Sequence, residues 1–438
     1  MLSVVDGCGL AADPVLPSRD ALLDAEQVAS ILLETVGVDG PIDLRGCVRV
    51  RAKYRIGESL RVVYRLDVGG RQQLVSARAF RSGGSAGVYE RAKPVAVPAG
   101  ALRQVWHDRP RDVVWWSFPN DRKLRGLSHL LPPRHELAGR LDMGEAADRV
   151  WRRSEVVEYA PERSVTLRAS DEWDRPVAFA KVFAPGTVDV RALARRYDNI
   201  AAALLSSRAP VTAPRTLGQS AGDNLLLLQA MPGRHWSQLD RPELPPSLHA
   251  LGVAIATLHS VAATPLGMPR FARLDVRRIE HSAQLIAAAR PDVAALVRGV
   301  AERLCSDPAV LEAPVLLHGD CHPKNALLDD GRVALIDFDQ AGSGAAAADI
   351  GSLLARLRQG ALLGELSADA DALGAAFLDG YRSVRPLPAA RSLQWHTAAA
   401  LLAERAMRAV NRVNVAALGR LDELLFAADS ILRTGVSR

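Results

Sequence analysis

Short alternations of apolar and polar residues dominate the N-terminal third of the chain. Residues 47–80 carry such runs, with Gly69-Gly70 between two of them, and this pattern predicts antiparallel strands joined by a tight turn. Residues 113–116 read Val-Val-Trp-Trp, which predicts a further strand. Ahead of these strands, residues 21–36 have the apolar spacing of a helix, with Asp20 placed to cap it.

A second strand-rich block follows. Residues 156–183 predict three strands, residues 190–205 a helix and residues 225–228 a short buried strand. From residue 234 onward the chain is largely helical in pattern, except in residues 315–340, where short apolar runs alternate with polar turns. This order of elements predicts an α+β protein with its sheets first and its helices last.

The two strand-rich blocks resemble each other. Residues 54–58 begin with Tyr and lead through a hairpin to residues 77–80, and residues 159–163 begin with Tyr and lead to residues 180–183. Each hairpin ends in a basic residue between small and apolar ones. The similarity is typical of an internal duplication. Any two antiparallel hairpins share much of this pattern, however, so both interpretations stay open.

Composition narrows the class of protein. The 438 residues are 48% hydrophobic and 24% charged, which is ordinary for a globular chain of roughly two to three domains. The net charge of +6 comes without a block of Lys and Arg, so we expect no nucleic-acid partner. The four cysteines show no metal or disulfide pattern, and no apolar run reaches about 18 residues. We therefore expect a cytoplasmic protein that does not enter a membrane.

The strongest chemical signal lies in two neighbouring segments. Residues 315–325 read Val-Leu-Leu-His-Gly-Asp-Cys-His-Pro-Lys-Asn, and residues 334–339 read Ala-Leu-Ile-Asp-Phe-Asp. Asp320 is suited to accept the proton of an attacking hydroxyl, and Asn325 and Asp337 offer the hard oxygen ligands that Mg²⁺ prefers. This spacing favours phosphoryl transfer from a nucleotide.

These motifs, His-Gly-Asp-x-His-x-x-Asn and Ile-Asp-Phe-Asp, resemble those of the aminoglycoside phosphotransferase / choline kinase superfamily. The resemblance covers the chain from about residue 150 to its C-terminus. It implies a bilobal protein-kinase-like fold, with an antiparallel-sheet N-lobe and a helical C-lobe. It also implies ATP- and Mg-dependent phosphorylation of a small molecule's hydroxyl, with Asp320 as the catalytic aspartate and Asn325 and Asp337 as the metal ligands.

The resemblance implies further roles for residues of the second strand-rich block. Lys181 matches the kinase lysine that contacts nucleotide phosphates, although a strand lysine reaching into solvent is the alternative. The kinase pattern places a Glu on the next helix, where Asp198 is the only acid in the body of the helix. No Gly-rich loop precedes the lysine, so we expect the backbone or side chain of Arg163 to contact phosphate, unless this is a plain surface turn. The backbones of Gln229 and Met231 are expected to bind adenine.

Residues 1–150 lie outside the usual core of the family. If they repeat the nucleotide-binding sheet, Arg78 takes the position of Lys181, and because a guanidinium does not replace a compact ammonium, we expect no productive ATP binding there. The placement resembles the N-terminal extension of maltokinase-like bacterial kinases. Those enzymes carry Gln in place of Asn325, so maltose is not assigned. The expected domains are a cap or degenerate lobe (1–150), a nucleotide-binding lobe (151–233) and a helical lobe with the catalytic loop and the substrate pocket (234–438).

The segment after Asp337 indicates the class of acceptor. It runs quickly into a helix near residue 350 and leaves little backbone to dock a peptide, so a small molecule is favoured and no obligate protein partner is evident. Asp349 is expected to cap that helix. The acceptor pocket is expected among the later helices, where the candidates are Trp395, Glu404, Arg405 and Arg408.

Two other functions stay open on the sequence. His318, Asp320 and His322 alternate like the ligands of a zinc hydrolase, although that interpretation leaves Asn325 and Asp337 unexplained. The missing Glu and the extra N-terminal block also fit a catalytically weak pseudokinase or nucleotide-binding scaffold. In the kinase interpretation His318 orients or packs the loop, and His322 bonds to the loop backbone.

Overall fold

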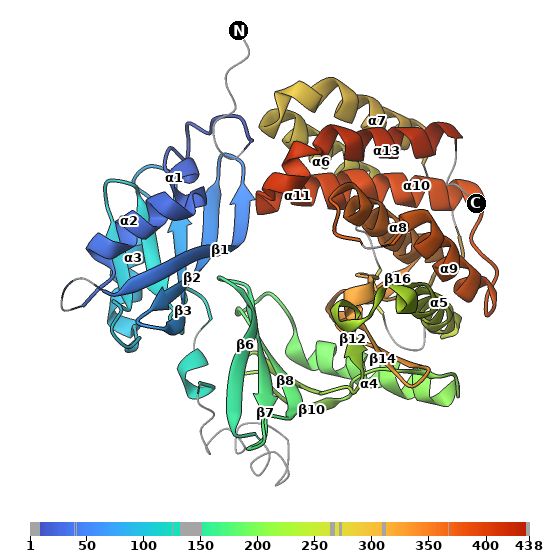
Figure 1. Cartoon of the computed structure of the whole chain (residues 1–438), viewed down its shortest axis with the longest axis horizontal. Coiled ribbons are helices and arrows are strands. Elements are labelled where there is room, and N and C mark those ends of the chain that lie inside the picture. The colour runs from blue at the N-terminus through green and yellow to red at the C-terminus, as the bar shows by residue number, and fades with distance from the viewer. Residues whose placement is uncertain are drawn as a thin grey trace. The chain divides into compact units, whose positions relative to one another are not determined.

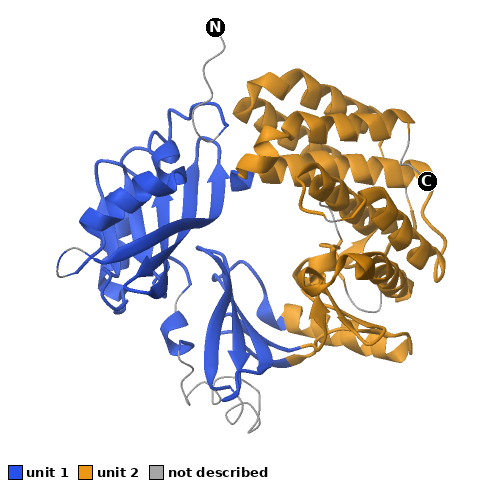
Figure 2. Cartoon of the chain, viewed as in Figure 1, with its two compact units in different colours: residues 1–191, 217–230, 411–413 blue, residues 192–216, 231–410, 414–438 orange. Residues whose placement is uncertain are grey.

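The fold is described from a computed structural model. The described residues are 9–38, 40, 42–124, 126–131, 151–262, 268–270, 274–308, 312–366 and 368–434. Contacts divide the chain into two compact units, coloured blue and orange in Figure 2: a first unit of residues 1–191, 217–230 and 411–413, and a second unit of residues 192–216, 231–410 and 414–438. The first unit is rich in strands and the second in helices (Figure 1).

The first unit begins with a five-stranded sheet in the order β1-β2-β3-β5-β4. Its strands are β1 (Leu44–Arg55), β2 (Ser59–Val68), β3 (Arg71–Ala79), β4 (Val105–Asp108) and β5 (Val113–Ser117), and its helices are α1 (Arg19–Leu23), α2 (Ala25–Thr35) and α3 (Ala86–Ala92). The predicted hairpin is confirmed, because β2 and β3 pair in antiparallel register on either side of Gly69 and Gly70.

The N-terminal helix differs from its prediction. The segment expected to form one helix is interrupted at Asp24, which ends α1 and begins α2. The Asp24 carboxylate accepts hydrogen bonds from the N–H groups of Glu26 and Gln27 and so caps α2. Asp20 lies inside α1 and pairs with Arg19, and the N-cap positions of α1 and α2 are Ser18 and Asp24, so its predicted capping role was wrong.

A second five-stranded sheet follows in the same unit, in the order β6-β7-β8-β11-β10. Its strands are β6 (Arg153–Ala160), β7 (Ser164–Ser170), β8 (Pro176–Phe183), β10 (Thr216–Ser220) and β11 (Leu225–Gln229), with α4 (Val190–Ser206) between β8 and β10. In each sheet three consecutive strands form a meander, a helix follows, and the last strand inserts beside the third.

The register of the two sheets is the same. In the first sheet Arg61 of β2 faces Arg78 of β3, and β5 pairs with the other edge of β3. In the second sheet Thr166 of β7 faces Lys181 of β8, and β11 pairs with the other edge of β8. Arg78 therefore occupies the position of Lys181, as the duplication interpretation predicts.

The turns match as well as the strands. Gly57 between β1 and β2 and Glu162 between β6 and β7 both have a φ of +63°. Asp112 before β5 and Asn224 before β11 have φ angles of +54° and +51°. Shared strand order, register and turn conformation confirm that the fold contains a structural repeat.

One hydrophobic cluster joins the two sheets of the first unit. Val63 of the first sheet and Tyr159, Val165 and Leu167 of the second belong to it, together with residues such as Leu124 from the chain between the sheets. Full burial of such aliphatic side chains contributes about 1.5–3 kcal/mol each.

The proposed three-part division at residues 150 and 233 stays a prediction.

Helices dominate the second unit. They are α5 (Leu244–Ser260), α6 (Val276–Ala289), α7 (Ala294–Ser306), α8 (Ala346–Leu362), α9 (Ala370–Arg382), α10 (Ala390–Ala400), α11 (Met407–Arg412), α12 (Val415–Gly419) and α13 (Leu421–Thr434). The short strands are β9 (Val211–Thr212), β12 (Arg234–His235), β13 (Val315–Leu317), β14 (Ala326–Asp329), β15 (Arg332–Leu335) and β16 (Gly342–Gly344). Within the described ranges, no helix is both long and apolar enough to cross a membrane.

Helices α5 and α9 approach each other closely through two glycines. A Cβ atom at Gly252 would lie 2.1 Å from the carbonyl oxygen of Phe377, and one at Gly380 would lie 2.0 Å from that of His249. Only residues without a side chain permit this contact. It fixes the packing of the two helices, whose C-terminal residues His259 and Tyr381 support the site described next.

Candidate active site

The two predicted motifs form one loop system in the second unit. β13 leads into residues 318–325, β14 and β15 form the hairpin that follows, and β16 returns to pair with β13. Gly319 has a φ of +80°, and a Cβ atom there would lie 2.0 Å from the carbonyl oxygen of Gln340. The glycine is therefore required both by its backbone conformation and by the close approach of the segment after Asp337.

Asp349 anchors the start of this loop. Its Oδ2 accepts a hydrogen bond from the His318 N–H at 2.7 Å, and its Oδ1 accepts one from the Gly319 N–H at 2.9 Å. His259 Nε2 lies 3.1 Å from Oδ2, and His259 Nδ1 lies 3.0 Å from the Tyr381 hydroxyl. Burial opposes ionisation of Asp349, but the hydrogen bonds from His259 and the loop keep its pKa below the ordinary value.

The predicted capping role of Asp349 was therefore wrong. Helix α8 begins at Ala346 without a side-chain cap, so Asp349 lies within its first turn. Its carboxylate instead accepts hydrogen bonds from the backbone N–H groups of His318 and Gly319 at the start of the loop. A buried carboxylate with this many donors is a strong constraint on the loop.

Asp320 is half-buried between a cation and a neutral histidine. Its Oδ1 lies 3.3 Å from Nη2 of Arg356, and its Oδ2 lies 3.8 Å from Nε2 of His322. Burial and the nearby Arg356 lower the pKa of His322 to about 2. The ring is therefore neutral at pH 7, and its Nδ1 accepts a hydrogen bond from the Lys324 N–H, as predicted for a residue that bonds to the loop backbone.

Asn325 links the two motifs. Its Nδ2 donates to the carbonyl oxygen of Asp320 at 3.0 Å, and its own carbonyl oxygen accepts from the Ile336 N–H at 2.9 Å. The bond from Nδ2 orients the side-chain amide so that Oδ1, the predicted metal ligand, is turned away from the Asp320 carbonyl. Asp337 directly follows Ile336 and has a φ of +67°, a strained conformation for a residue with a Cβ atom.

The residues beside the motif complete the support of the loop. His318 packs against Phe338 with ring centroids 4.8 Å apart, and its Nε2 bonds to the Ile336 carbonyl at 2.9 Å, which confirms its packing role. The Tyr197 hydroxyl of α4 donates to Asp339 at 2.8 Å. Among the described residues, no group of three His, Cys, Asp or Glu side chains is placed to hold a metal ion.

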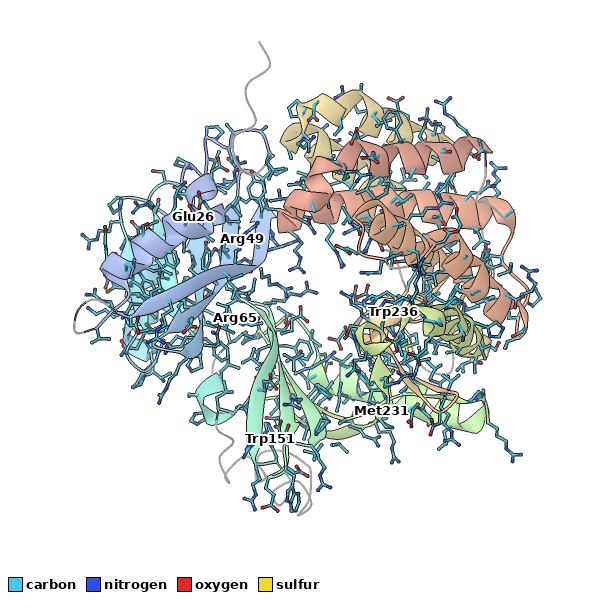
Figure 3. The ribbon with its side chains drawn as sticks, in the orientation of Figure 1. Glu26, Arg49, Arg65, Trp151, Met231 and Trp236 are labelled. Atoms are coloured by element: carbon cyan, nitrogen blue, oxygen red, sulfur yellow. The ribbon has the colours of Figure 1, made fainter. Side chains whose placement is uncertain are left out.

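The other predicted residues lie along the second sheet and its exit. Lys181 is half-buried in β8, and Gln229 ends β11 opposite Ala178. Met231 is half-buried at the start of a segment of the second unit and is labelled in Figure 3. Because Lys181 and the motif residues belong to different units, their convergence on one nucleotide stays a prediction.

Two of the predicted phosphate-site residues have other backbone or side-chain contacts. Asp198 is exposed, and its Oδ1 accepts a hydrogen bond from the Thr216 N–H at 2.8 Å. Its pairing with Lys181 stays a prediction. The Arg163 N–H donates to the Ala160 carbonyl at 3.0 Å within the β6–β7 turn. The side chain of Arg163 is exposed, and its contact with a phosphate stays a prediction.

Arg356 was not singled out from the sequence. It follows Asp349 by two helical turns on α8, so both side chains lie on one face of the helix. Burial lowers the pKa of its guanidinium, and Asp320 counteracts this shift. The one signal for Arg356 in the sequence is its i, i+7 spacing from Asp349. Because Asp349 is predicted from the sequence to be a helix cap, this spacing does not point to a site.

The candidate acceptor residues divide into two groups. Trp395 is buried and donates from Nε1 to the Leu304 carbonyl at 2.9 Å, so it belongs to the core. Glu404 and Arg405 form a buried pair at 3.2 Å in a π-helical segment, Leu401–Ala406. Such segments are frequent at functional sites, and Arg356 and Arg405 interact electrostatically.

Comparisons with known proteins identify the family. The sequence model of the phosphotransferase enzyme family matches residues 162–387, just over half of the chain. No curated protein sequence matches the chain. Similar solved structures include a thermostable mutant of aminoglycoside phosphotransferase APH(4)-Ia, which is 17% identical over 63% of this chain and 94% of that chain, with a TM-score of 0.47.

Two further structures show the same range of similarity. Macrolide 2′-phosphotransferase MphH from Brachybacterium faecium is 20% identical over 71% of this chain and 99% of its own, with a TM-score of 0.40. A choline/ethanolamine kinase family protein from Mesorhizobium loti is 15% identical over 64% of this chain and 88% of its own, with a TM-score of 0.41. The assignment depends on the family match: the chain belongs to the phosphotransferase enzyme family and is a small-molecule phosphotransferase.

Proposed function

We propose that this protein transfers the γ-phosphoryl group of ATP to a hydroxyl group of a small molecule. One observation carries the proposal: hydrogen bonds within one unit join the Asn325 amide to the backbone carbonyl of Asp320, and the backbone of Asn325 to Ile336, the residue before Asp337. A carboxylate beside two oxygen ligands is what phosphoryl transfer requires, because the protein's task is to position the reactants and to neutralise charge.

The proposed reaction is an attack of the acceptor hydroxyl on ATP, with Asp320 as the proton acceptor. The acceptor oxygen attacks the γ-phosphorus, its proton passes to the Asp320 carboxylate, and the bond from phosphorus to the β–γ bridging oxygen breaks to leave ADP. The Arg356 guanidinium, 3.3 Å from the carboxylate, orients Asp320. Positioning of this kind converts a bimolecular step into an effectively unimolecular one.

The proposed nucleotide-binding roles are those that the sequence predicts. Asn325 and Asp337 would hold Mg²⁺, which supplies charge neutralisation on the phosphates when bound. Lys181 and the Arg163 side chain would contact the phosphates, with Asp198 as the partner of Lys181. The backbone of Gln229 and Met231 would bind adenine.

The proposed acceptor is a small molecule with a hydroxyl group, such as a sugar, an amino alcohol or an antibiotic. Helix α8 begins at Ala346, soon after Asp337, so the segment that docks peptides in protein kinases has no counterpart of useful length here. The acceptor would lie beside the half-buried Arg356 and Arg408 and the buried Glu404, which carry charges of both signs. Such a mixed set of charges does not favour a polycation over a neutral molecule.

The test is a screen of acceptors with Mg·ATP. Purified protein is incubated with a panel of sugars, amino alcohols and antibiotics, and mass spectrometry detects an acceptor that has gained one phosphoryl group. We expect at least one such product, which requires Mg²⁺ and is absent with Asp320→Asn. ATP binding without any transfer would favour the scaffold alternative, and neither binding nor transfer would contradict the proposal.

A further inference from the structure

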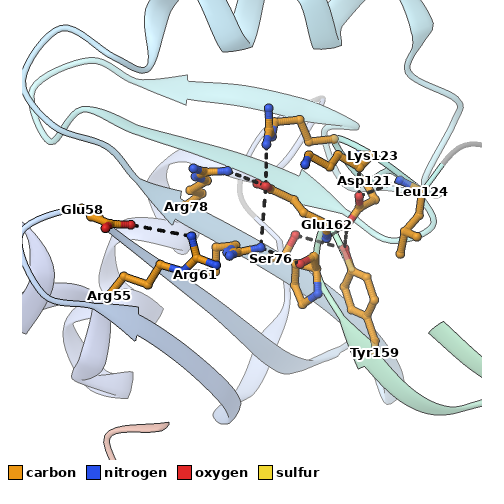
Figure 4. A network of polar contacts seen from close by, with 12 residues as sticks. Arg55, Glu58, Arg61, Ser76, Arg78, Asp121, Lys123, Leu124, Tyr159 and Glu162 are labelled. Atoms are coloured by element: carbon orange, nitrogen blue, oxygen red, sulfur yellow. Dashed lines mark hydrogen bonds and ion pairs between the residues drawn. The ribbon is translucent and has the colours of Figure 1, made fainter. Parts of the chain in front are cut away.

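The carboxylate of Glu162 is the meeting point of three arginines. Arg78 hydrogen-bonds to its Oε2, Arg122 donates to the same oxygen at 2.7 Å, and Arg61 lies 3.7 Å away (Figure 4). Only 6% of Glu162 is exposed. Burial opposes ionisation, but the hydrogen bonds from Arg122 and Arg78 keep the pKa of Glu162 below its ordinary value. Glu162 is therefore held as a buried anion.

The backbone of Glu162 is held as firmly as its side chain. Its N–H donates to Oδ2 of Asp121 at 2.9 Å, and the same oxygen accepts from the Tyr159 hydroxyl at 2.7 Å. The φ of +63° costs about 1–2 kcal/mol in a residue that has a Cβ atom. Gly57 fills the matching turn of the first sheet without that cost, so the presence of a Glu at this position calls for a use of its carboxylate.

The repeat shows what kind of site receives this carboxylate. Arg78 takes the same register position in the first sheet that Lys181 takes in the second. Lys181 is the residue proposed above to bind nucleotide phosphates. The first sheet therefore has a cation, Arg78, at the position that corresponds to Lys181. Arg78 binds the carboxylate of Glu162 in the same chain.

We propose that the first sheet is an anion-binding module whose permanent ligand is the Glu162 carboxylate, and that this contact fixes the β6–β7 turn in the conformation that receives ATP. Glu162 is then a positioning residue, which acts on the nucleotide through the adjacent Arg163. The inference rests on the proposed function, because that proposal assigns the turn to ATP. Fixing the turn beforehand removes the cost of ordering it from the binding of ATP.

The first test separates positioning from general stability. Glu162→Gln removes the charge at constant size, and Arg78→Met removes one of its partners. Arg51→Met is the matched control, because Arg51 pairs with Glu158 of the same unit outside the turn. We expect both test variants to raise the KM for ATP about tenfold, which corresponds to the ordering of one loop, with kcat within about twofold. The control should keep the wild-type KM.

A merely structural ion pair would behave differently. It would lower the melting temperature and leave the KM for ATP unchanged, and that result would overturn the proposal, as would an equal rise in Arg51→Met. Glu162→Gly serves if Glu162→Gln does not fold, because glycine accepts the left-handed backbone and still lacks the carboxylate. It should show the same rise in KM.

Hydrogen exchange tests the contact without any catalysis. Amides of residues 159–165 should exchange faster in Glu162→Gln and Arg78→Met than in the wild type, and at the wild-type rate in Arg51→Met. Unchanged exchange in the two test variants would overturn the proposal. A wild-type protein that neither binds nor turns over ATP would contradict the proposed function instead, and the exchange result would still report on the module.

Discussion

The carboxylate of Asp349 accepts a hydrogen bond from the backbone N–H of His318 at 2.7 Å. This contact joins the first turn of α8 to the start of the loop that carries Asp320. Asp349→Asn would replace an acceptor oxygen by an NH₂ group and leave a buried N–H unpaired. We expect the free energy of unfolding to fall by roughly 2–3 kcal/mol, with a loss of turnover, as measured by urea denaturation and a kinase assay.

The control for this prediction is an exposed carboxylate that also binds a backbone N–H. Asp369 caps α9 by accepting from the Asp371 N–H. Because Asn caps helices about as well as Asp, Asp369→Asn should change stability by less than about 0.5 kcal/mol. Equal effects of the two substitutions would show that Asp349 has no special role in the loop.

Alanine substitutions at Gly319 and Gly331 distinguish the effect of backbone strain from the effect of a steric clash. Both have left-handed backbones, with φ of +80° and +79°, but a Cβ atom would collide with the Gln340 carbonyl only at Gly319. Gly331→Ala should cost about 1–2 kcal/mol and keep activity. Gly319→Ala should cost more and abolish transfer, because the loop must move away from Gln340. Wild-type turnover in Gly319→Ala would contradict the assigned loop geometry.

Arg356 provides the contact that orients Asp320. Arg356→Met keeps much of the apolar stem and removes the guanidinium, which lies 3.3 Å from the Asp320 carboxylate. We expect kcat to fall by about tenfold or more, with little change in the affinity for ATP, because the contact is to the base rather than to the nucleotide. Isothermal calorimetry and steady-state kinetics measure the two quantities. A weaker affinity with unchanged kcat would place Arg356 at the nucleotide instead.

Lys53 in β1 makes stability depend on pH. Burial, aided by the positive charges of Arg412 and Arg55, lowers its pKa from 10.5 to about 8. The folded protein therefore disfavours the ammonium, and this destabilisation is present below pH 8 and disappears as the pH rises toward 10.5. Lys53→Met should raise the melting temperature at pH 7, with a gain that shrinks between pH 8 and 10.5. The exposed Lys93 gives the control variant, Lys93→Met, which should show no such pH-dependent gain.

Local patterns predicted the sheets well. The alternation of apolar residues and the glycine pair gave β2 and β3, and the matching Tyr-led hairpins predicted the repeat that the shared register of Arg78 and Lys181 confirms. The N-terminal helix was predicted less well. Both Asp20 and Asp24 are residues that can cap a helix. Which of them does so depends on where the tertiary fold interrupts the helical backbone.

The candidate site, like the fold, could be predicted from the sequence only in part. Asp320, Asn325 and Asp337 could be singled out because their spacing along the chain is itself the signal, and their roles stay predictions. The contacts of Asp349 and Glu162 could not be predicted, since they depend on partners far away in sequence. The Asp349 carboxylate bonds to a loop about thirty residues earlier in the chain, and Glu162 in the β6–β7 turn bonds to Arg78 of the other sheet. Neither contact is visible in the local sequence, which is typical of a helix cap around Asp349 and of a surface turn around Glu162.

The most direct test of the central claim is single-turnover phosphoryl transfer by Asp320→Asn, together with its affinity for Mg·ATP. If Asp320 takes the acceptor proton, transfer should slow by roughly 10²- to 10⁴-fold, while the dissociation constant for Mg·ATP and the melting temperature stay near the wild-type values. Transfer at close to the wild-type rate in a folded, nucleotide-binding Asp320→Asn variant would contradict the account.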